Sequence, residues 1–178
     1  DGGGNTGGDG NGDGGNNGGN GGPSDGDGTE EDGYDGLFAL PSTKYVLTSD
    51  YTLTEADVKA TKGNGGVSLW HLCSFDLGGH TLDLGGYTLG ISTSSKKVIK
   101  FENGKITNGK LNVSIPDGDI EFTATETDKT VTYELTAASE TIRFSNAVIG
   151  GKCTVKSNTR VSVEYATVSD LTFTGNGT

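Results

Sequence analysis

Short strands separated by tight bends dominate the hydrophobic pattern from residue 75 onward. The segment 75–91, FDLGGHTLDLGGYTLGI, contains three apolar-x-apolar units, and a glycine pair follows each of the first two. The seven-residue spacing fits a coiled-coil heptad, but glycine, threonine and β-branched residues fill the segment and helix formers are scarce. The pattern therefore predicts strands whose alternate residues face one core, joined at corners where glycine adopts positive φ.

A longer period, of roughly 20 residues, relates the later segments to one another. The aligned apolar pairs, in chain order, are Ile99/Phe101, Leu111/Val113, Ile120/Phe122, Tyr133/Leu135, Ile142/Phe144, Cys153/Val155, Val161/Val163 and Leu171/Phe173. Short strands that recur at this spacing are typical of solenoids, because stacked turns bury a continuous core that no single turn can bury.

The region before the repeats predicts a strand and a short helix. Residues 44–53 alternate and are rich in β-formers. In the segment that follows, Thr54 is the expected N-cap with Asp57 at position N3, and Leu53 and Val58 form a hydrophobic staple.

Residues 67–77 then alternate again, with Trp70 and Leu72 on the face opposite to the other apolar side chains. His71 is expected to lie in this cap, and His80 in a corner of the first turn.

These segments resemble right-handed parallel β-helix proteins of the pectin-lyase-like kind. The resemblance rests on residues 75–91 and on the stacked segments that begin at residues 99, 142 and 161. It implies an all-β fold, a three-sided coil of about five turns. The expected turns begin near residues 75, 98, 120, 141 and 160. Residues 37–74 would form a short strand-and-helix cap and 75–178 the β-helix. A β-sandwich is the alternative, because short strands at intervals of about 8–12 residues also suit that fold.

The first 36 residues differ in composition from the rest of the chain. They hold 17 of the 32 glycines, nine acidic residues and no lysine or arginine. Residues 37–178 carry 15 acidic and 13 basic groups, so most of the net charge of −11 belongs to the tail. Because such a Gly/Asn/Asp-rich segment has too few apolar side chains to offset its ordering entropy, 1–36 are predicted to be a disordered linker.

One motif in this tail has the form of a calcium-binding loop. Asp9, Asn11 and Asp13 match the D-x-N-x-D-G start of an EF-hand loop. However, Asn20 occupies the position of the bidentate glutamate, and no helix is predicted on either side. We therefore expect a plain linker and no cofactor, with weak calcium binding as the alternative.

Several functional classes and a disulfide are excluded by the pattern. No basic patch suits nucleic acid, and no apolar run approaches the roughly 18 residues of a membrane span. Cys153 aligns with core residues, and Cys73 lies three to four turns earlier. The separation would be on the order of 15–19 Å, whereas a disulfide needs Cα atoms within about 7 Å. Both cysteines should be free and buried.

No set of residues with the pattern of a catalytic site stands out. The family that the chain resembles includes polysaccharide lyases and hydrolases, phage tailspikes and adhesins. A glycosidase needs two carboxylates that converge on one bond, but Asp76 and Asp83 are expected on different sides of a turn. Glu121 and Arg143 are expected to form a cross-strand ion pair. Thr-x-Thr rows of an ice-binding face do not recur at equal places in the turns.

We therefore expect a non-catalytic, extracellular structural or adhesive β-solenoid. The acidic linker would tether it as in bacterial surface lipoproteins, or join it to other modules as in phage fibres. The alternative is a carbohydrate-active β-helix, such as a lyase, a hydrolase or a depolymerase fragment. Its sugar platforms would be Tyr87, Tyr133 and Tyr165.

The final repeat predicts an interaction surface. Residues 160–174 have the pattern of an interior turn, with no capping segment after them. An uncapped turn leaves unpaired backbone groups and open core. We expect self-association, or further residues, to cover Val161, Val163, Leu171 and Phe173.

Overall fold

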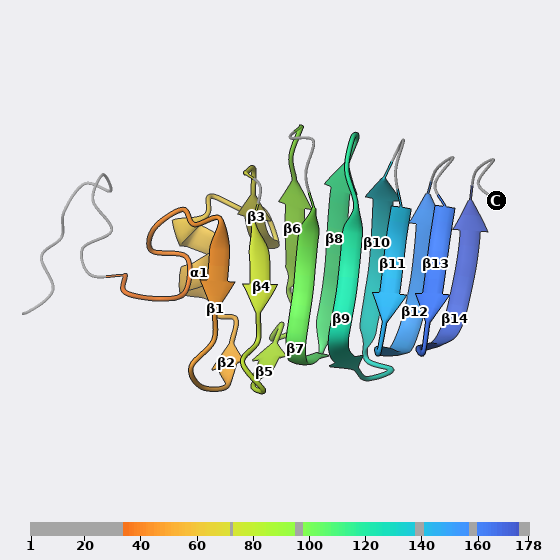
Figure 1. Ribbon diagram of the computed structural model, residues 1–178. Coiled ribbons are helices and arrows are strands. Elements are labelled where there is room, and N and C mark those ends of the chain that lie inside the picture. Colours follow the sequence, from red (N-terminus) through yellow and green to blue (C-terminus); the bar gives the residue numbers. More distant parts are fainter. Residues whose placement is uncertain (1–33, 72, 95–97, 138–140, 157–159, 175–178) are drawn as a thin grey trace, which may run out of the picture. The chain divides into compact units, whose positions relative to one another are not determined.

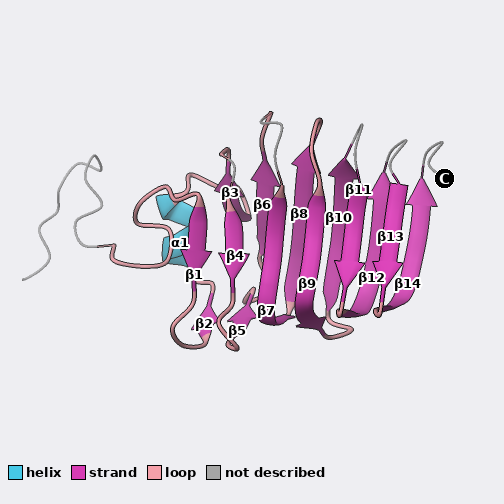
Figure 2. Ribbon diagram, in the orientation of Figure 1, coloured by secondary structure: helices cyan, strands magenta, loops and turns pink. Residues whose placement is uncertain are grey.

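A computed structural model describes residues 34–71, 73–94, 98–137, 141–156 and 160–174 of the 178-residue chain. These residues form a mostly β structure, a β-solenoid of about four turns with parallel sheets and one short helix (Figures 1 and 2). The predicted solenoid is confirmed, and the β-sandwich alternative is wrong because the strands pair in parallel from turn to turn.

The elements, in chain order, are β1 (Lys44–Val46), β2 (Tyr51–Thr52), α1 (Glu55–Ala60), β3 (Gly66–Leu69), β4 (Ser74–Asp76), β5 (Thr81–Asp83), β6 (Thr88–Ser92), β7 (Ile99–Thr107), β8 (Gly109–Ile115), β9 (Ile120–Thr127), β10 (Val131–Ala137), β11 (Thr141–Ser145), β12 (Val148–Lys156), β13 (Arg160–Glu164) and β14 (Thr167–Thr174).

The coil has three sides. The first side stacks β1, β4, the start of β7, the start of β9, β11 and β13. The second stacks β2, β5, the ends of β7 and β9, and the starts of β12 and β14. The third stacks β3, β6, β8, β10 and the ends of β12 and β14.

The register gives the length of each turn. From Phe75 the chain returns to the same place on the first side at Phe101, Phe122, Phe144 and Val163, after 26, 21, 22 and 19 residues. The five predicted starting points lie within about one residue of the starts of β4, β7, β9, β11 and β13. From β4 to β13, these starting points span about four complete turns.

The region expected to be a cap contributes strands to the coil. β1, β2 and β3 pair in register with β4, β5 and β6, and α1 is inserted between β2 and β3. The predicted capping box of α1 is confirmed: the Thr54 side chain accepts from the backbone N–H of Asp57, and the Asp57 side chain accepts from that of Thr54. The stacked sheets therefore extend back to Lys44.

A column of aromatic rings fills the core behind the first side. Tyr45, Phe75, Phe101, Phe122 and Phe144 stack in order, with ring centroids 5.1 to 5.3 Å apart. The register places them at one position of successive turns, so each inner ring contacts the rings above and below it. Such a pair contributes about 0.5–1.5 kcal/mol beyond the burial of its area.

Left-handed residues form the corner between the first and second sides. Gly78 and Gly79 have positive φ there, as predicted, and in later turns Asn103, Ala124 and Asn146 do so as well. Asp76 braces this corner, because its carboxylate accepts from the Gly78 N–H and from the Asn103 amide.

Both cysteines are free and buried, as predicted. Burial raises the pKa of each thiol to about 12, so both thiols stay protonated and inert at neutral pH. Within the described part of the chain, the helix is too short to cross a membrane.

Candidate functional site

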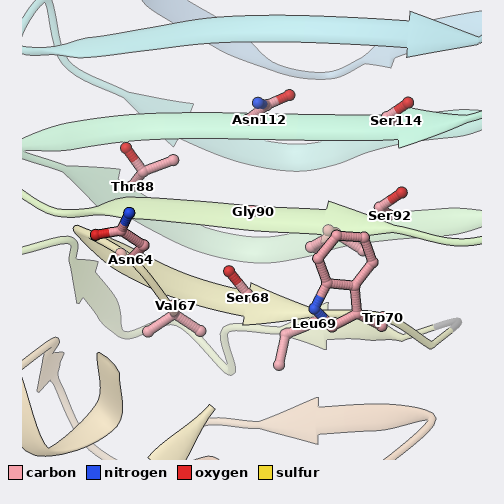
Figure 3. A pocket seen from close by; sticks show the side chains of 12 residues that line it. Asn64, Val67, Ser68, Leu69, Trp70, Thr88, Gly90, Ser92, Asn112 and Ser114 are labelled. Carbon is pink, nitrogen blue, oxygen red and sulfur yellow. The ribbon is translucent and has the colours of Figure 1, made fainter. Parts of the chain in front are cut away.

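A hollow of about 320 Å³ lies on the outer face of the third side, over β3, β6 and β8 (Figure 3). The register aligns Ser68 with Gly90 and Gly90 with Asn112, and all three positions face outward between buried neighbours. Because Gly90 has no side chain, the outward row is interrupted at its position. We call this concave surface the Trp70 hollow, after the side chain at its edge.

Trp70 projects from the chain immediately after β3. Its side chain is 76% exposed, although tryptophan is among the residues that gain most from burial. Since Leu69 is level with Ile91, Trp70 stands level with Ser92, and Figure 3 shows its indole beside that serine. The alternation of the strand explains this direction, because Val67 and Leu69 are buried while Ser68 and Trp70 point outward.

Neutral polar side chains make up the rest of the lining. Hydroxyl and amide groups line the hollow, and they belong to Asn64, Ser68, Thr88, Ser92, Asn112 and Ser114. No charged side chain is among the described residues that line the hollow. The charged residues Lys110 and Glu134, further along the same side, pair with each other at 2.9 Å. The hollow therefore combines one flat apolar surface with uncharged donors and acceptors.

A second hollow, of about 560 Å³, lies over the second side and its corner with the first. Its lining includes Thr81, Lys105 and Glu126, and Lys105 pairs with Glu126 at 3.6 Å. It has no aromatic side chain among its described lining residues, which makes it the weaker candidate for ligand binding.

The outer face of the first side carries a chain of ion pairs. Seven side chains alternate in sign along it, in the order Asp76, Lys44, Glu102, Lys100, Glu121, Arg143 and Asp119, with nitrogen–oxygen distances from 2.5 to 3.8 Å. The predicted pair of Glu121 with Arg143 is confirmed, and its members are register partners. We call this set the charge ladder. The hydrogen bond from Lys44, and then that from Asn103, hold the pKa of Asp76 below its usual value.

Asp76 and Asp83 lie on different sides of the turn, as predicted, and each braces a corner. The Asp83 carboxylate accepts from the Gly85 N–H and from the Asn108 amide, which repeats the arrangement around Asp76. Both carboxylates are therefore held by structural partners on separate faces.

The two histidines occupy the regions expected of them. His71 Nε2 lies 3.0 Å from the Ser42 carbonyl oxygen and 3.3 Å from the Tyr45 hydroxyl. His80 follows a corner and lies 3.6 Å from Asp50. Within the described ranges, no group of three or more His, Cys, Asp or Glu residues is placed to hold a metal ion. The calcium motif at Asp9, Asn11 and Asp13 lies outside the described residues.

The three tyrosines proposed as sugar platforms have different environments. Tyr133 is 1% exposed and packs edge-on against Phe122, so this candidate is wrong: its ring has no face open to a ligand. Inward parity, which it shares with Leu111 and Cys153, explains the burial. Tyr87 is partly buried against the core, and Tyr165 is 95% exposed.

The residue that sequence reasoning missed is Trp70. Its outward parity was available from the alternation of 67–77. The neighbours that make it a site lie on two later turns, so only the register could bring them to it.

The residues predicted for assembly are on the last rung. Val161 and Leu171 are partly buried and Val163 is 47% exposed, whereas the Phe173 side chain lies outside the described residues. Among the described strands, β13 pairs with β11 alone and β14 with β12 alone, so each has one edge without a strand partner.

Comparisons with protein-family models, with curated proteins and with solved structures found no match to this chain.

Proposed function

We propose that the protein is a non-catalytic, extracellular structural or adhesive module of a cell surface or a virion fibre. The observation that carries this proposal is the charge ladder. Its three cations and four carboxylates are paired with one another along the first side. Paired charges fix neighbouring turns in place, whereas a hydrolase or lyase needs acidic or basic groups that converge on a substrate.

The two exposed hollows support an adhesive role. The Trp70 hollow presents an aromatic side chain and neutral polar groups on a rigid sheet, an arrangement suited to recognition. None of the described residues that line the Trp70 hollow supplies a carboxylate or an imidazole.

The test is incubation of the full chain with a panel of acidic and neutral polysaccharides. Reducing ends would report hydrolysis, and unsaturated uronate products would report lyase action. We expect neither above the level of a heat-denatured sample. Turnover that is lost in Asp76→Asn or Asp83→Asn would refute the non-catalytic role.

A carbohydrate-active enzyme is the second candidate, and the exposed indole in a concave surface of a parallel sheet favours it. In that case Glu134, the acidic residue level with Asn112 on the third side, would supply the carboxylate. Its pairing with Lys110 argues for a structural role instead. Glu134→Gln would separate the two, since it would abolish turnover only in the enzyme.

The likeness to the right-handed, pectin-lyase-like β-helices forms part of the proposal. The three sides of each turn support it, and connections between parallel strands are right-handed in the great majority of sheets. Antibody labelling of intact cells that produce the protein, or of intact virions that carry it, would test the extracellular location. Labelling only after lysis would refute it.

Self-association through the last rung is the partner that we propose. The open edges of β13 and β14 lie near three exposed apolar side chains, Val148, Val163 and Tyr165. Unpaired edges with apolar neighbours favour strand pairing between copies. Sedimentation at micromolar concentration should show an oligomer that Val163→Lys dissociates, and a monomer throughout would contradict it.

A further inference from the structure

We propose that the Trp70 hollow binds a neutral polysaccharide, with the indole of Trp70 packed against the face of a sugar ring. This inference rests on the proposed function, because it names the ligand of the adhesive module.

The indole supplies the first argument. Trp70 is 76% exposed and projects from the end of a short strand whose preceding residue, Leu69, is buried. An exposed tryptophan at the edge of a hollow offers a ligand a large, flat apolar contact surface. The ring face of a pyranose carries C–H groups on one side, and it is flat enough to lie against an indole without displacing polar contacts.

The lining supplies the second argument. A sugar ring presents hydroxyl groups around its edge, and each can both donate and accept a hydrogen bond. Ser68, Ser92 and Ser114 have the same dual capacity, and the Asn112 amide has separate donor and acceptor atoms. A hollow that contains such groups beside an aromatic surface at its edge matches the edge and the face of a sugar together.

The charge distribution decides between neutral and acidic polysaccharides. The hollow has no cation among its described lining residues to recognise a uronate or a sulfate. The nearest lysine on this side, Lys110, is level with the lining residue Thr88 and is paired with Glu134. An acidic chain would therefore lose hydration without gaining a salt bridge.

The row of Gly90 sets the shape of the site. Ser68 and Asn112, the register partners of Gly90 in the turns before and after it, both carry outward side chains. A methyl group added at Gly90 would meet its nearest atom, the Val67 carbonyl oxygen, at 3.4 Å, so a small side chain fits the strand. Gly90→Thr would fill the hollow with the same kind of group that surrounds it, leaving its polarity unchanged.

The chain contains one tryptophan, which makes the site directly observable. Intrinsic fluorescence would be recorded during titration with neutral dextran, galactomannan and β-glucan oligosaccharides, and with polygalacturonate and alginate as acidic competitors. We expect a spectral change and protection from acrylamide quenching with at least one neutral glycan, stronger for longer chains, and none with the acidic ones.

Affinity electrophoresis in gels containing the same polysaccharides would compare the variants. The apparent affinity obtained from the retardation should fall at least tenfold in Trp70→Ala and in Gly90→Thr. Trp70→Tyr should keep part of the affinity that Trp70→Ala loses. Leu40→Ala is the matched control, because it removes an apolar side chain that is as exposed as Trp70, at 77%, and that does not line the hollow. Circular dichroism melting would show that each variant is folded.

Two patterns would overturn the inference: binding by Trp70→Ala and Gly90→Thr that is as strong as binding by the unsubstituted chain, or binding of acidic glycans alone. Retention by none of the panel would also overturn it. If no polysaccharide is bound and no oligosaccharide is released, the proposed non-catalytic surface role is not contradicted. Release of oligosaccharides would instead refute the proposed function, while the glycan titrations would still report on the hollow.

Discussion

Replacement of Asp57 by asparagine should destabilise the first rung of the solenoid. The side chain of Asp57 is fully buried at the start of α1. One carboxylate oxygen accepts from the hydroxyls of Tyr34 and Tyr51, at 2.5 and 2.6 Å. The other accepts from the backbone N–H and the hydroxyl of Thr54, both at 2.7 Å. The carboxylate thereby joins the start of α1 to Tyr51, six residues before it, and to Tyr34, 23 residues before it.

The size of the effect follows from these four hydrogen bonds. A hydrogen bond to a charged group contributes about 1.5–3 kcal/mol. In Asp57→Asn, the amide oxygen can keep one pair of donors, while the amide nitrogen faces the other pair. Since a tyrosine hydroxyl can rotate and accept from that nitrogen, part of the loss is recovered. We expect the free energy of unfolding to fall by about 2–4 kcal/mol.

The loss should depend on pH, and its sign follows from the pKa of Asp57. Burial alone would raise this pKa, but the hydrogen bonds from Tyr34, Tyr51 and Thr54 outweigh it and hold the pKa below its usual value. The contribution is therefore complete above the unfolded-state pKa, near about 4. It is lost as pH falls through the folded-state value, because the unfolded chain takes up the proton first. Asparagine does not titrate, so the free energies of unfolding of the unsubstituted chain and of Asp57→Asn should converge in acid.

Urea unfolding followed by circular dichroism, at pH 7 and at pH 3, measures both effects. Tyr34→Phe and Tyr51→Phe should each cost less than Asp57→Asn, because each removes one donor. Asp35→Asn, at an exposed position, should change the unfolding free energy by less than about 0.5 kcal/mol. A deficit in Asp57→Asn below about 0.5 kcal/mol at pH 7, or one that does not shrink at pH 3, would refute the reasoning.

Three further substitutions test the core and the corners, with thermal or urea unfolding as the measurement. Phe122→Ala should cost about 3–5 kcal/mol, since it removes the ring stacked between two others; a cost below about 1 kcal/mol would contradict the aromatic column. Gly104→Ala should cost about 2 kcal/mol or more, because its new methyl would lie 2.4 Å from Leu77 Cβ and 2.5 Å from the His80 carbonyl oxygen. If Gly104→Ala left the free energy of unfolding unchanged, the turns would be less tightly packed than these two distances indicate. Tyr165→Asn should stabilise the monomer by about 0.5–1 kcal/mol, because asparagine tolerates the left-handed φ of 51° better than tyrosine does. Destabilisation would show that the exposed tyrosine makes a contact that the described residues do not include.

Local features of the chain determined much of the fold. Alternation in short segments decides which side chains face inward, so the alignment of Phe101, Phe122 and Phe144 followed from spacing alone, and their rings stack. The capping box of Thr54 and Asp57 likewise depends on residues three apart, and the structure has it. Glycine pairs marked corners because few other residues adopt positive φ without strain.

Local composition does not reveal one contact of the predicted linker. This segment, 1–36, includes Tyr34, because glycine and aspartate surround it, and the hydroxyl of Tyr34 donates to the buried Asp57 carboxylate. A contact between residues 23 positions apart leaves no trace in local composition. The same limit applies to Tyr133. Its inward parity is visible in the sequence, but its burial depends on the neighbouring turns that cover it.

The candidate site was decided by the tertiary structure. Ser68, Gly90 and Asn112 are 22 residues apart from one to the next, and they form one row only because the third side repeats in register at that interval. The turns of the first side differ in length, from 19 to 30 residues, so an average period cannot place one side chain beside another. Alternation along a strand determines whether a side chain faces the core or the solvent. The lengths of the connections between strands determine what it meets there, and those lengths are set by the packing of whole turns.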